Sequence, residues 1–187
     1  MMNSEHFWRL LEPEHPAAEA FCRRLTGSRD EGDDLYQDAL VRAIEKFTSL
    51  RDQRAFRPWL YQIMINTYRN RCRQPWWRRR QELTEPMFEA ARVDNPSHRY
   101  DARRWLRRAF RALTPAQRAL VILHEIEGWS TGDLAQLCQR PDGTVKARLS
   151  RARRLMRRAL ERSPDAEDET NESEADYAIP RKRPALE

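Results

Sequence analysis

The sequence predicts an all-α protein: two small helical domains joined by a flexible linker, the C-terminal domain a helix-turn-helix. Apolar residues recur at helical spacing through most of the chain, and no segment alternates apolar and polar residues for long, as a strand would. Prolines and polar residues gather over 74–100 between the two helical parts. We therefore expect domains at residues 1–73 and 101–163, a linker at 74–100 and an acidic disordered tail at 164–187.

Three helices are expected in the first domain. The first runs from Ala17 to Leu25 and ends at Thr26–Gly27, the second from Asp33 to Phe47, and the third from Arg57 to Arg73 with Pro58 in its first turn. Their helical spacing turns one set of side chains inward: Leu35, Ala39, Ile44, Phe47, Leu60, Ile63, Met64 and Thr67.

Helices resume near Asp101. Thr114 is followed by Pro115 and then by Gln117, which is the pattern of a capping box with proline at the first helical position. Gly128 is expected to end this helix. Its buried side is predicted to consist of Ala119, Leu120, Leu123 and Ile126.

A helix-turn-helix follows. Ser130 and Asp133 form a second capping box, and Leu134, Ala135 and Leu137 supply packing residues. The segment 139–143 breaks that helix, and 143–158 forms the next one. The last helix has two faces: an apolar stripe of Val145, Leu149, Ala152 and Met156, and a small or basic face of Lys146, Ser150, Arg151 and Arg154. Such a helix can dock on its own domain and place its other face in a DNA major groove.

Charge is unevenly distributed. The chain of 187 residues has a net charge of +6, whereas residues 164–187 hold 8 acidic and 3 basic side chains. The remainder therefore carries a net charge of +11. The strong positive charge of residues 1–163 favours a polyanionic partner, and nucleic acid is the usual one.

Several classes of function are disfavoured. With five glycines and four histidines, no phosphate-cradling loop, catalytic triad or metal-ligand cluster is recognisable, so we expect no enzyme, no cofactor and no metal. No apolar run approaches the ~20 residues of a membrane span, and the first residues do not form a secretory signal, so we expect a cytoplasmic protein. Cys22, Cys72 and Cys138 are widely spaced and are interpreted as buried or half-buried thiols.

Two motifs resemble one protein family. EGDDLYQDALVRAIEKF and FRPWLYQIMINTYRNRCR closely resemble the second conserved region of bacterial RNA polymerase sigma factors of the extracytoplasmic-function (ECF) group. LTPAQRALVILHEIEGWSTGDLAQLCQRPDGTVKARLSRAR resembles the fourth conserved region of the same group. Their order fits, and the domain that larger sigma factors carry between these regions is missing here, as it is in the ECF group. The resemblance extends over roughly residues 17–160.

The resemblance implies a docking site for core RNA polymerase. Asp34, Gln37 and Asp38 match the family positions that contact the coiled-coil clamp helices of the largest polymerase subunit. These side chains lie about one turn apart, where carboxylates and an amide can meet a basic partner helix. A solvated helix face is the alternative.

The resemblance also implies two sets of DNA contacts. Phe56, Trp59, Ile63 and Asn66 match the part that opens and recognises the minus-ten promoter element, with the loop 48–55 as a lid over an unstacked base. For Trp59 and Ile63 the alternative is core packing. Phosphate contacts are expected from Arg69, Arg71, Arg73 and Arg78–Arg80, and contacts to the minus-thirty-five element from Lys146, Ala147, Ser150, Arg151 and Arg154.

Three further residues have simpler interpretations. Arg148 and Arg153 sit nearer the domain body and are expected to hold phosphates or acidic neighbours, and Trp129 is interpreted as packing. The pair Trp76–Trp77 is unexplained by the family pattern; a linker anchor on the first domain is favoured over stacking on DNA.

These observations favour a sigma factor that binds core RNA polymerase, directs it to promoter DNA and is held by an anti-sigma factor. The first alternative is a stand-alone helix-turn-helix regulator, which would not explain the motifs of the first domain. The second is an inactive sigma-like adaptor that binds polymerase without promoter selectivity.

Overall fold

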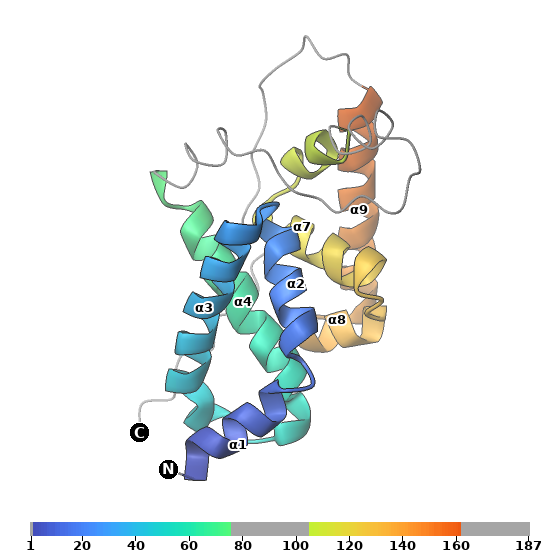
Figure 1. Cartoon of the computed structure of the whole chain (residues 1–187). Helices are drawn as coiled ribbons and strands as arrows, with labels where there is room; N and C mark the ends of the chain where they lie inside the picture. The colour runs from blue at the N-terminus through green and yellow to red at the C-terminus, as the bar shows by residue number, and fades with distance from the viewer. Residues whose placement is uncertain (1, 76–104, 162–187) are drawn as a thin grey trace.

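The computed structural model describes residues 2–75 and 105–161, and every regular element in these ranges is helical (Figure 1). The expected linker, with Trp76–Trp77 and Arg78–Arg80, lies outside the described residues apart from its first two positions, and so does the acidic tail. The first part contains α1 (Met2–Leu11), α2 (His15–Thr26), α3 (Arg29–Lys46), η1 (Phe47–Ser49), η2 (Gln53–Ala55) and α4 (Phe56–Cys72). The second contains a helical segment at 105–111, α7 (Pro115–Val121), η3 (Ile122–Ile126), α8 (Thr131–Cys138) and α9 (Asp142–Glu161).

Helices α2 and α3 form a tight antiparallel pair. Gly27 ends α2 with a φ of 74°, where its N–H donates to the Arg23 carbonyl. Helix α3 begins at Arg29 because the Ser28 hydroxyl caps it by accepting from the Glu31 N–H, so the expected start at Asp33 was four residues late. A Cβ at Gly32 would lie 2.4 Å from Arg23 Cα, so only glycine allows this close crossing.

The core of the first part is aromatic at one end. Helix α1, which the sequence did not reveal, places the Phe7 ring 5.2 Å from that of Phe47 and 5.8 Å from that of Phe56. Burial is confirmed for Leu35, Ala39, Phe47, Leu60, Met64 and Thr67, while Ile63 is half-buried. The inward placement of Ile44 was wrong: its side chain is 43% exposed, because it lies about 100° around α3 from the buried Ala43.

Helix α7 begins with the expected capping box of Thr114 and Gln117. It continues into a π-helical turn, η3, in which the Glu127 N–H donates to the Ile122 carbonyl at 3.0 Å. The wider turn leaves Ile126 47% exposed, contrary to the expected burial, whereas Ala119, Leu120 and Leu123 are buried. Gly128, with a φ of 71°, ends the segment as predicted.

The helix-turn-helix is confirmed. Ser130 and Asp133 form the predicted capping box on α8, and Leu134 and Leu137 are buried beneath it, with Ala135 partly buried. Gln139 adopts the left-handed region with a φ of 51° and ends the helix. On α9 the apolar stripe is confirmed: Val145, Leu149 and Ala152 are buried and Met156 is partly buried.

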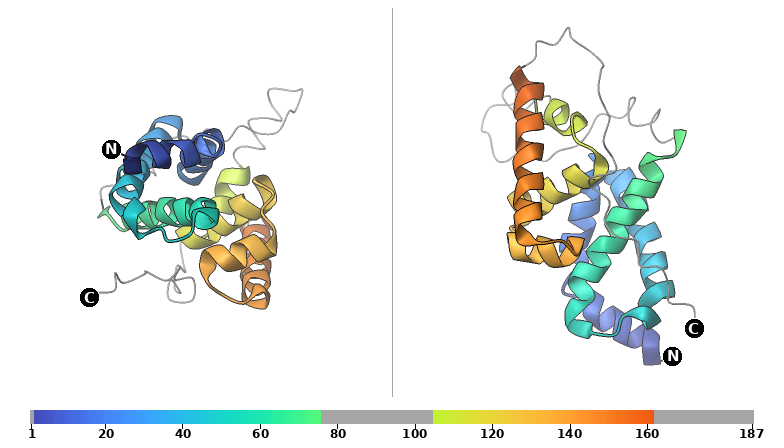
Figure 2. Two further views of the ribbon diagram at one scale, coloured as in Figure 1. Left: turned by 90° about the horizontal axis from the view of Figure 1, so that it is seen from below. Right: turned by 180° about the vertical axis from the view of Figure 1, so that it is seen from behind.

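The two parts pack directly against each other, which the sequence did not predict. Helix α4 lies against α7 and α8, as the view from behind in Figure 2 shows. Helix α4 has a second buried side, formed by Tyr61, Ile65 and Tyr68, which the sequence did not predict. One continuous apolar core therefore extends across both parts. Within the described residues no helix is both long enough and apolar enough to span a bilayer.

Candidate DNA and polymerase interfaces

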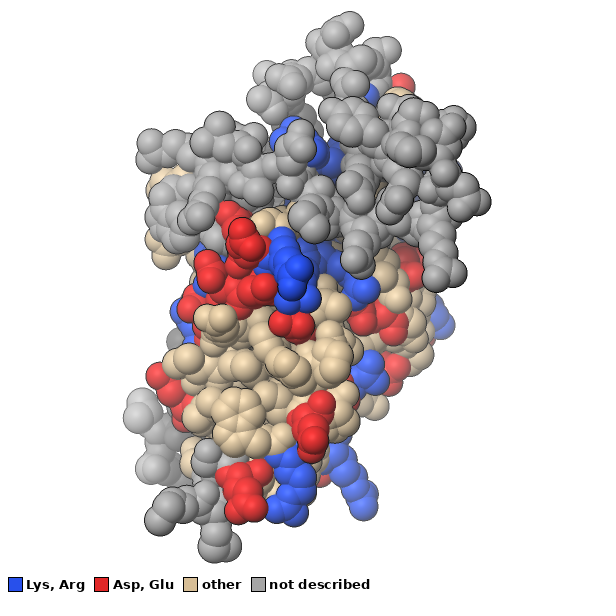
Figure 3. All heavy atoms as spheres, in the orientation of Figure 1, with Lys and Arg blue, Asp and Glu red and all other residues tan. Residues whose placement is uncertain are grey.

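Helix α3 presents a mixed polar surface. Asp34, Gln37 and Asp38 are exposed, as predicted. Arg71 of α4 reaches across and donates from Nε to Asp38 Oδ2 at 3.1 Å and from Nη2 to the Asp34 carbonyl at 2.9 Å. Arg71, for which the sequence suggested a phosphate contact, therefore braces α4 against α3. Figure 3 shows acidic side chains gathered where α3 begins, beside basic ones.

The same face of α3 turns apolar one turn later. Val41 is 57% exposed and Ile44 is exposed beside it, and Gln37, Val41 and Ile44 follow each other at spacings of four and three residues. We call Asp34, Gln37, Asp38, Val41 and Ile44 the α3 surface. The apolar half was missed because the hydrophobic pattern of α3 was assigned entirely to the core.

Helix α4 carries the residues assigned to the minus-ten element. Trp59, Ile63 and Asn66 are half-buried and follow each other at spacings of four and three residues, so they share one face of the helix. Phe56 is only 3% exposed and packs with the Trp59 ring at 5.8 Å, so it supports Trp59 from inside the core. Arg69, half-buried, and Arg73, exposed, lie toward the C-terminal end of α4.

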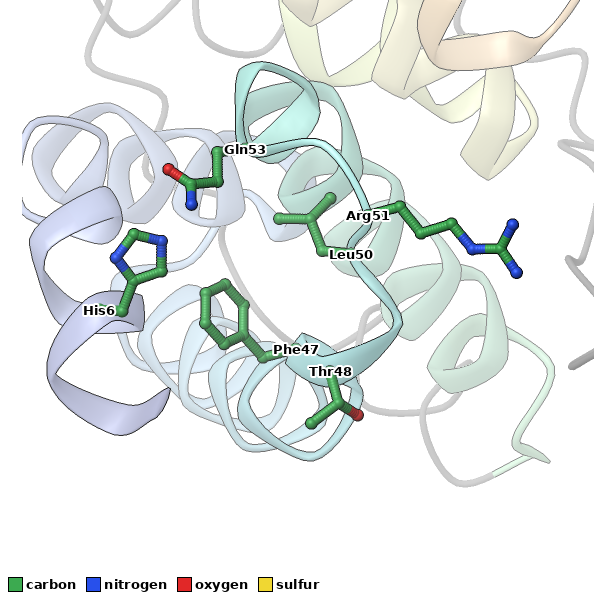
Figure 4. Close-up of a pocket in the computed structure, with 6 residues that line it drawn as sticks. All are labelled: His6, Phe47, Thr48, Leu50, Arg51 and Gln53. Carbon is green, nitrogen blue, oxygen red and sulfur yellow. The ribbon is translucent and has the colours of Figure 1, made fainter. Parts of the chain in front are cut away.

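A cavity of about 350 Å³ lies between α1 and the segment that joins α3 to α4. Figure 4 shows the side chains that line it: His6, Phe47, Thr48, Leu50, Arg51 and Gln53. Four of these come from the predicted lid, 48–55. Asn66 is not among the lining residues, so the structure does not bring the predicted amide edge to this cavity. His6 was not anticipated, since α1 gave no recognisable motif.

The outer face of α9 holds the residues assigned to the minus-thirty-five element. Lys146, Ala147, Ser150, Arg151 and Arg154 are all exposed. The Lys146 ammonium lies 2.6 Å from Asp142 Oδ2, and its hydrogen bond, with a second one from Thr131, lowers the pKa of the Asp142 carboxyl.

The inner flank of α9 is tied to the domain body. Arg153 donates from Nη2 and Nε to Glu125 Oε1 at 2.6 and 2.9 Å, which confirms the acidic neighbour expected for it. Arg148 is half-buried on the same helix. Arg153 is therefore tied to Glu125 although half of its side chain is exposed.

The junction of the two parts is built around Trp129, whose burial is confirmed. Its indole lies 4.8 Å from the Tyr61 ring between centroids, and the Arg57 guanidinium lies 4.6 Å from the indole centroid. Arg24 pairs with Glu127. Arg118 donates from Nη1 to Tyr68 Oη at 2.7 Å and to the Leu25 carbonyl at 3.2 Å.

The cysteines of the chain lie in its two described parts. Cys22 and Cys138 are buried and Cys72 is half-buried, as expected. Burial raises the pKa of the Cys22 and Cys138 thiols, so they stay protonated at neutral pH. Within 2–75 and 105–161, no three His, Cys, Asp or Glu side chains gather as metal ligands do.

Comparisons with known proteins agree with this architecture. Residues 10–78 match the model of sigma-70 region 2, and residues 103–156 match that of sigma-70 region 4. The chain is 34% identical over 142 residues to the RNA polymerase sigma-E factor of Streptomyces avermitilis, covering 75% of this chain and 76% of that protein. It is 29% identical over 154 residues to the ECF RNA polymerase sigma factor SigM of Mycobacterium tuberculosis, covering 82% and 76%.

A solved structure is also similar. The sigma factor RpoE of Bartonella quintana, determined in complex with the anti-sigma factor NepR, superposes with a TM-score of 0.59 and is 29% identical, covering 83% of this chain and 97% of that one. Region 2 corresponds to the part with α2, α3 and α4, and region 4 to the part with α7, α8 and α9. The chain therefore belongs to the extracytoplasmic-function group of RNA polymerase sigma factors.

Proposed function

We propose that this chain binds core RNA polymerase and directs it to promoters, with the α3 surface on the clamp helices of the largest subunit. The α4 stripe of Trp59, Ile63 and Asn66 contacts the minus-ten element, with Phe56 supporting Trp59 from the core. The exposed face of α9 contacts the minus-thirty-five element. The observation that carries this proposal is that one chain presents both a basic helix-turn-helix face and the α3 and α4 surfaces of region 2.

The proposed division of the chain follows from these roles. Residues 1–73 form the unit for polymerase docking and minus-ten melting, 74–100 the linker, 101–163 the unit for the minus-thirty-five element, and 164–187 an acidic tail. Arg69 and Arg73, at the end of α4, contact phosphates of the duplex upstream of the melted segment. A stand-alone helix-turn-helix regulator is disfavoured, because it would have no use for the exposed Val41 and Ile44 of α3.

The packed arrangement and the DNA-engaged arrangement must differ. The names of the two promoter elements place them about 25 base pairs apart, which is about 85 Å of duplex at 3.4 Å per base pair. A domain of about 70 residues has a radius of gyration of about 11 Å, so two touching domains are too short for this span. The contacts around Trp129 therefore have to break before both elements are bound.

Two buried polar groups without hydrogen-bond partners weaken the junction between the two parts. Tyr61 Oη and Trp129 Nε1 are both buried without a hydrogen-bond partner, and each such group reduces the free energy gained by packing. Core polymerase, by binding the α3 surface and region 4 at a distance from each other, supplies the free energy that pulls the two parts apart.

An anti-sigma factor is the proposed second partner. The similar RpoE of Bartonella quintana was solved in complex with the anti-sigma factor NepR. The exposed apolar side chains of the α3 surface offer such a partner a ready site, and its occupation would exclude the polymerase.

The test is transcription with purified core polymerase on a library of duplexes randomised over both promoter segments. The chain should enrich a two-part sequence and initiate from it, whereas core alone should not. Enrichment of a single duplex motif without initiation would favour the stand-alone regulator. Polymerase binding without enrichment would favour the inactive adaptor.

A further inference from the structure

Helix α9 carries a wide basic face. The helix holds seven basic residues and only two carboxylates, Asp142 and Glu161, which stand at its two ends. At about 100° per residue, one set of exposed residues falls within an arc of about 140° opposite the buried stripe. We call this set the α9 basic face: Lys146, Ser150, Arg151, Arg154 and Arg158. In the view from behind in Figure 2, α9 runs along the outer edge of the molecule.

The residues that follow α9 in the sequence have the opposite charge. Residues 165–176 hold seven carboxylates and no basic or aromatic side chain. They lie outside the described residues, and also beyond residue 156, where the match to region 4 ends. The family pattern therefore gives this segment no role. Its chemistry is that of a flexible polyanion, which is the class of partner that the α9 basic face fits.

The acidic segment is long enough to reach the whole of the α9 basic face. The distance along α9 from Glu161 back to Lys146 is about 22 Å, at 1.5 Å per residue. Residues 165–176 span up to about 40 Å when extended. A segment tethered so close to its target has an effective concentration on the order of millimolar there. Ion pairs that would be too weak between separate molecules can therefore hold it in place.

We propose that residues 165–176 bind the α9 basic face of the same chain and compete there with the DNA backbone. The proposal rests on the proposed contact of α9 with the minus-thirty-five element and adds its regulation. Competition of this kind lowers the affinity of α9 for every duplex by the same factor. The free chain therefore stays off DNA, whereas the complex with core polymerase still binds promoters through its other DNA contacts.

The site of contact is tested on the full chain without DNA. A water-soluble carbodiimide couples a carboxylate to an amine that touches it. Outside the acidic tail the chain has two lysines, Lys146 on α9 and Lys46 at the end of α3, and both are exposed. Mass spectrometry should find residues 165–176 linked to Lys146 at low salt, with Lys46 as the internal control. The link should fade in about 1 M salt, where the screening length falls to about 3 Å.

Two outcomes of this experiment would overturn the proposal. One is a tail linked to Lys46 as often as to Lys146, which would place the segment on no particular face. The other is a Lys146 that couples to Asp142, 2.6 Å away, and never to the tail, because the local link proves that the amine is reactive.

The competition is tested by binding of short duplex DNA of mixed sequence. A chain that ends at Ser163 keeps all of α9, and its thermal transition checks that it folds. It should bind about tenfold more tightly than the full chain at low salt, as a millimolar effective concentration gives for a contact of about 0.1 mM affinity. The ratio of the two affinities should approach one in high salt, since both partners are exposed charges.

Variants of full length separate a contact from a general effect of net charge. Exchange of the seven carboxylates for amides keeps the tail length and should match truncation. In the double variant Arg154→Ala, Arg158→Ala, truncation should gain much less than tenfold. The matched control, Arg29→Ala with Arg42→Ala, removes two exposed charges from region 2 and should keep the full gain.

Equal affinities of the full and truncated chains at low salt would contradict the competition, and so would equal gains in the two double variants. Failure of both lengths to bind any duplex would instead defeat the proposed DNA contact of α9. The Lys146 link would still decide, in that case, where the acidic segment lies.

Discussion

The indole of Trp129 rests on the phenol ring of Tyr61, with 4.8 Å between the ring centroids, and this is one of the contacts that join region 4 to region 2. Trp129→Ala should remove it, at a cost of about 3–5 kcal/mol in stability, and should let the two parts separate. The radius of gyration in small-angle X-ray scattering should rise. Trp105→Ala is the control, since Trp105 is 49% exposed, and an unchanged radius for Trp129→Ala would contradict the role of this contact.

Polymerase docking depends on the α3 surface. Replacing Asp34 and Gln37 by Arg should abolish core binding, because like charges brought together at an interface cost several kcal/mol. Asp38 is left in place because it anchors Arg71. Pull-down of core polymerase is the measurement, with Glu12→Arg, an exposed charge reversal elsewhere, as the control. Retention of core by the double variant at the parent level would remove these residues from the docking site.

The two DNA-contacting helices should fail at different steps. Arg151→Ala should lose ~1–3 kcal/mol of discrimination at one minus-thirty-five base pair. Asn66→Ala should impair strand opening and largely keep duplex binding. Permanganate footprinting beside a duplex binding assay distinguishes the steps, and Arg153→Ala serves as a control because Arg153 is engaged by Glu125. An identical defect in both assays for the two variants would argue against the division.

Gly32 is expected to be essential to the α2–α3 crossing. Gly32→Ala brings a methyl group to 2.4 Å from Arg23 Cα, so the helices must move apart at a cost of about 1–3 kcal/mol. Gly143→Ala is the matched control: nothing lies within 4 Å of its added Cβ, and helix propensity predicts a gain of about 0.5–1 kcal/mol. Urea unfolding of both variants measures the difference in stability. Equal unfolding midpoints for the two variants would show that α2 and α3 can move apart without loss of stability.

The cap of α8 should make the helix-turn-helix sensitive to acid. Hydrogen bonds from the Ser130 hydroxyl and backbone lower the pKa of Asp133 below its ordinary value of 3.8. A carboxyl with a depressed folded pKa adds stability that is fully present above the unfolded pKa and is lost as the pH falls through the folded pKa. The parent should therefore lose more stability than Asp133→Asn between pH 5 and about pH 2, as followed by urea unfolding. Equal losses of stability in the parent and in Asp133→Asn over this pH range would rule out the cap as the cause.

Local signals in the sequence predicted much of this structure. The capping boxes at Thr114 and Ser130 and the stripe on α9 depend on neighbours within a few residues, so they were predicted correctly. Ile44 and Ile126 were misplaced because periodicity shows that a residue is apolar and cannot show which partner covers it. Packing between distant segments, such as Tyr61 on Trp129, leaves no local signature.

The residues of the candidate site also divide into those that the local sequence predicts and those that only the fold brings together. The α3 residues were predicted from the resemblance of their motif and the α9 residues from helical spacing, and both sets are exposed on one helix each. His6 and Gln53 lie 47 positions apart in the sequence and meet only through the fold, so no spacing rule connects them.

The number of residues in the π-helical turn at Ile122–Ile126 determines how the following residues meet the first part at the junction. Such a turn holds one residue more than an α-helix needs between its hydrogen-bonded groups. Deleting one residue there would restore ordinary helical bonding and rotate everything that follows by about 100°. Glu127 and Trp129 would then swing away from Arg24 and Tyr61, and α9 would turn relative to α7, against which it packs. The one extra residue of this turn therefore sets the register both of the junction and of the packing of the helix-turn-helix on α7.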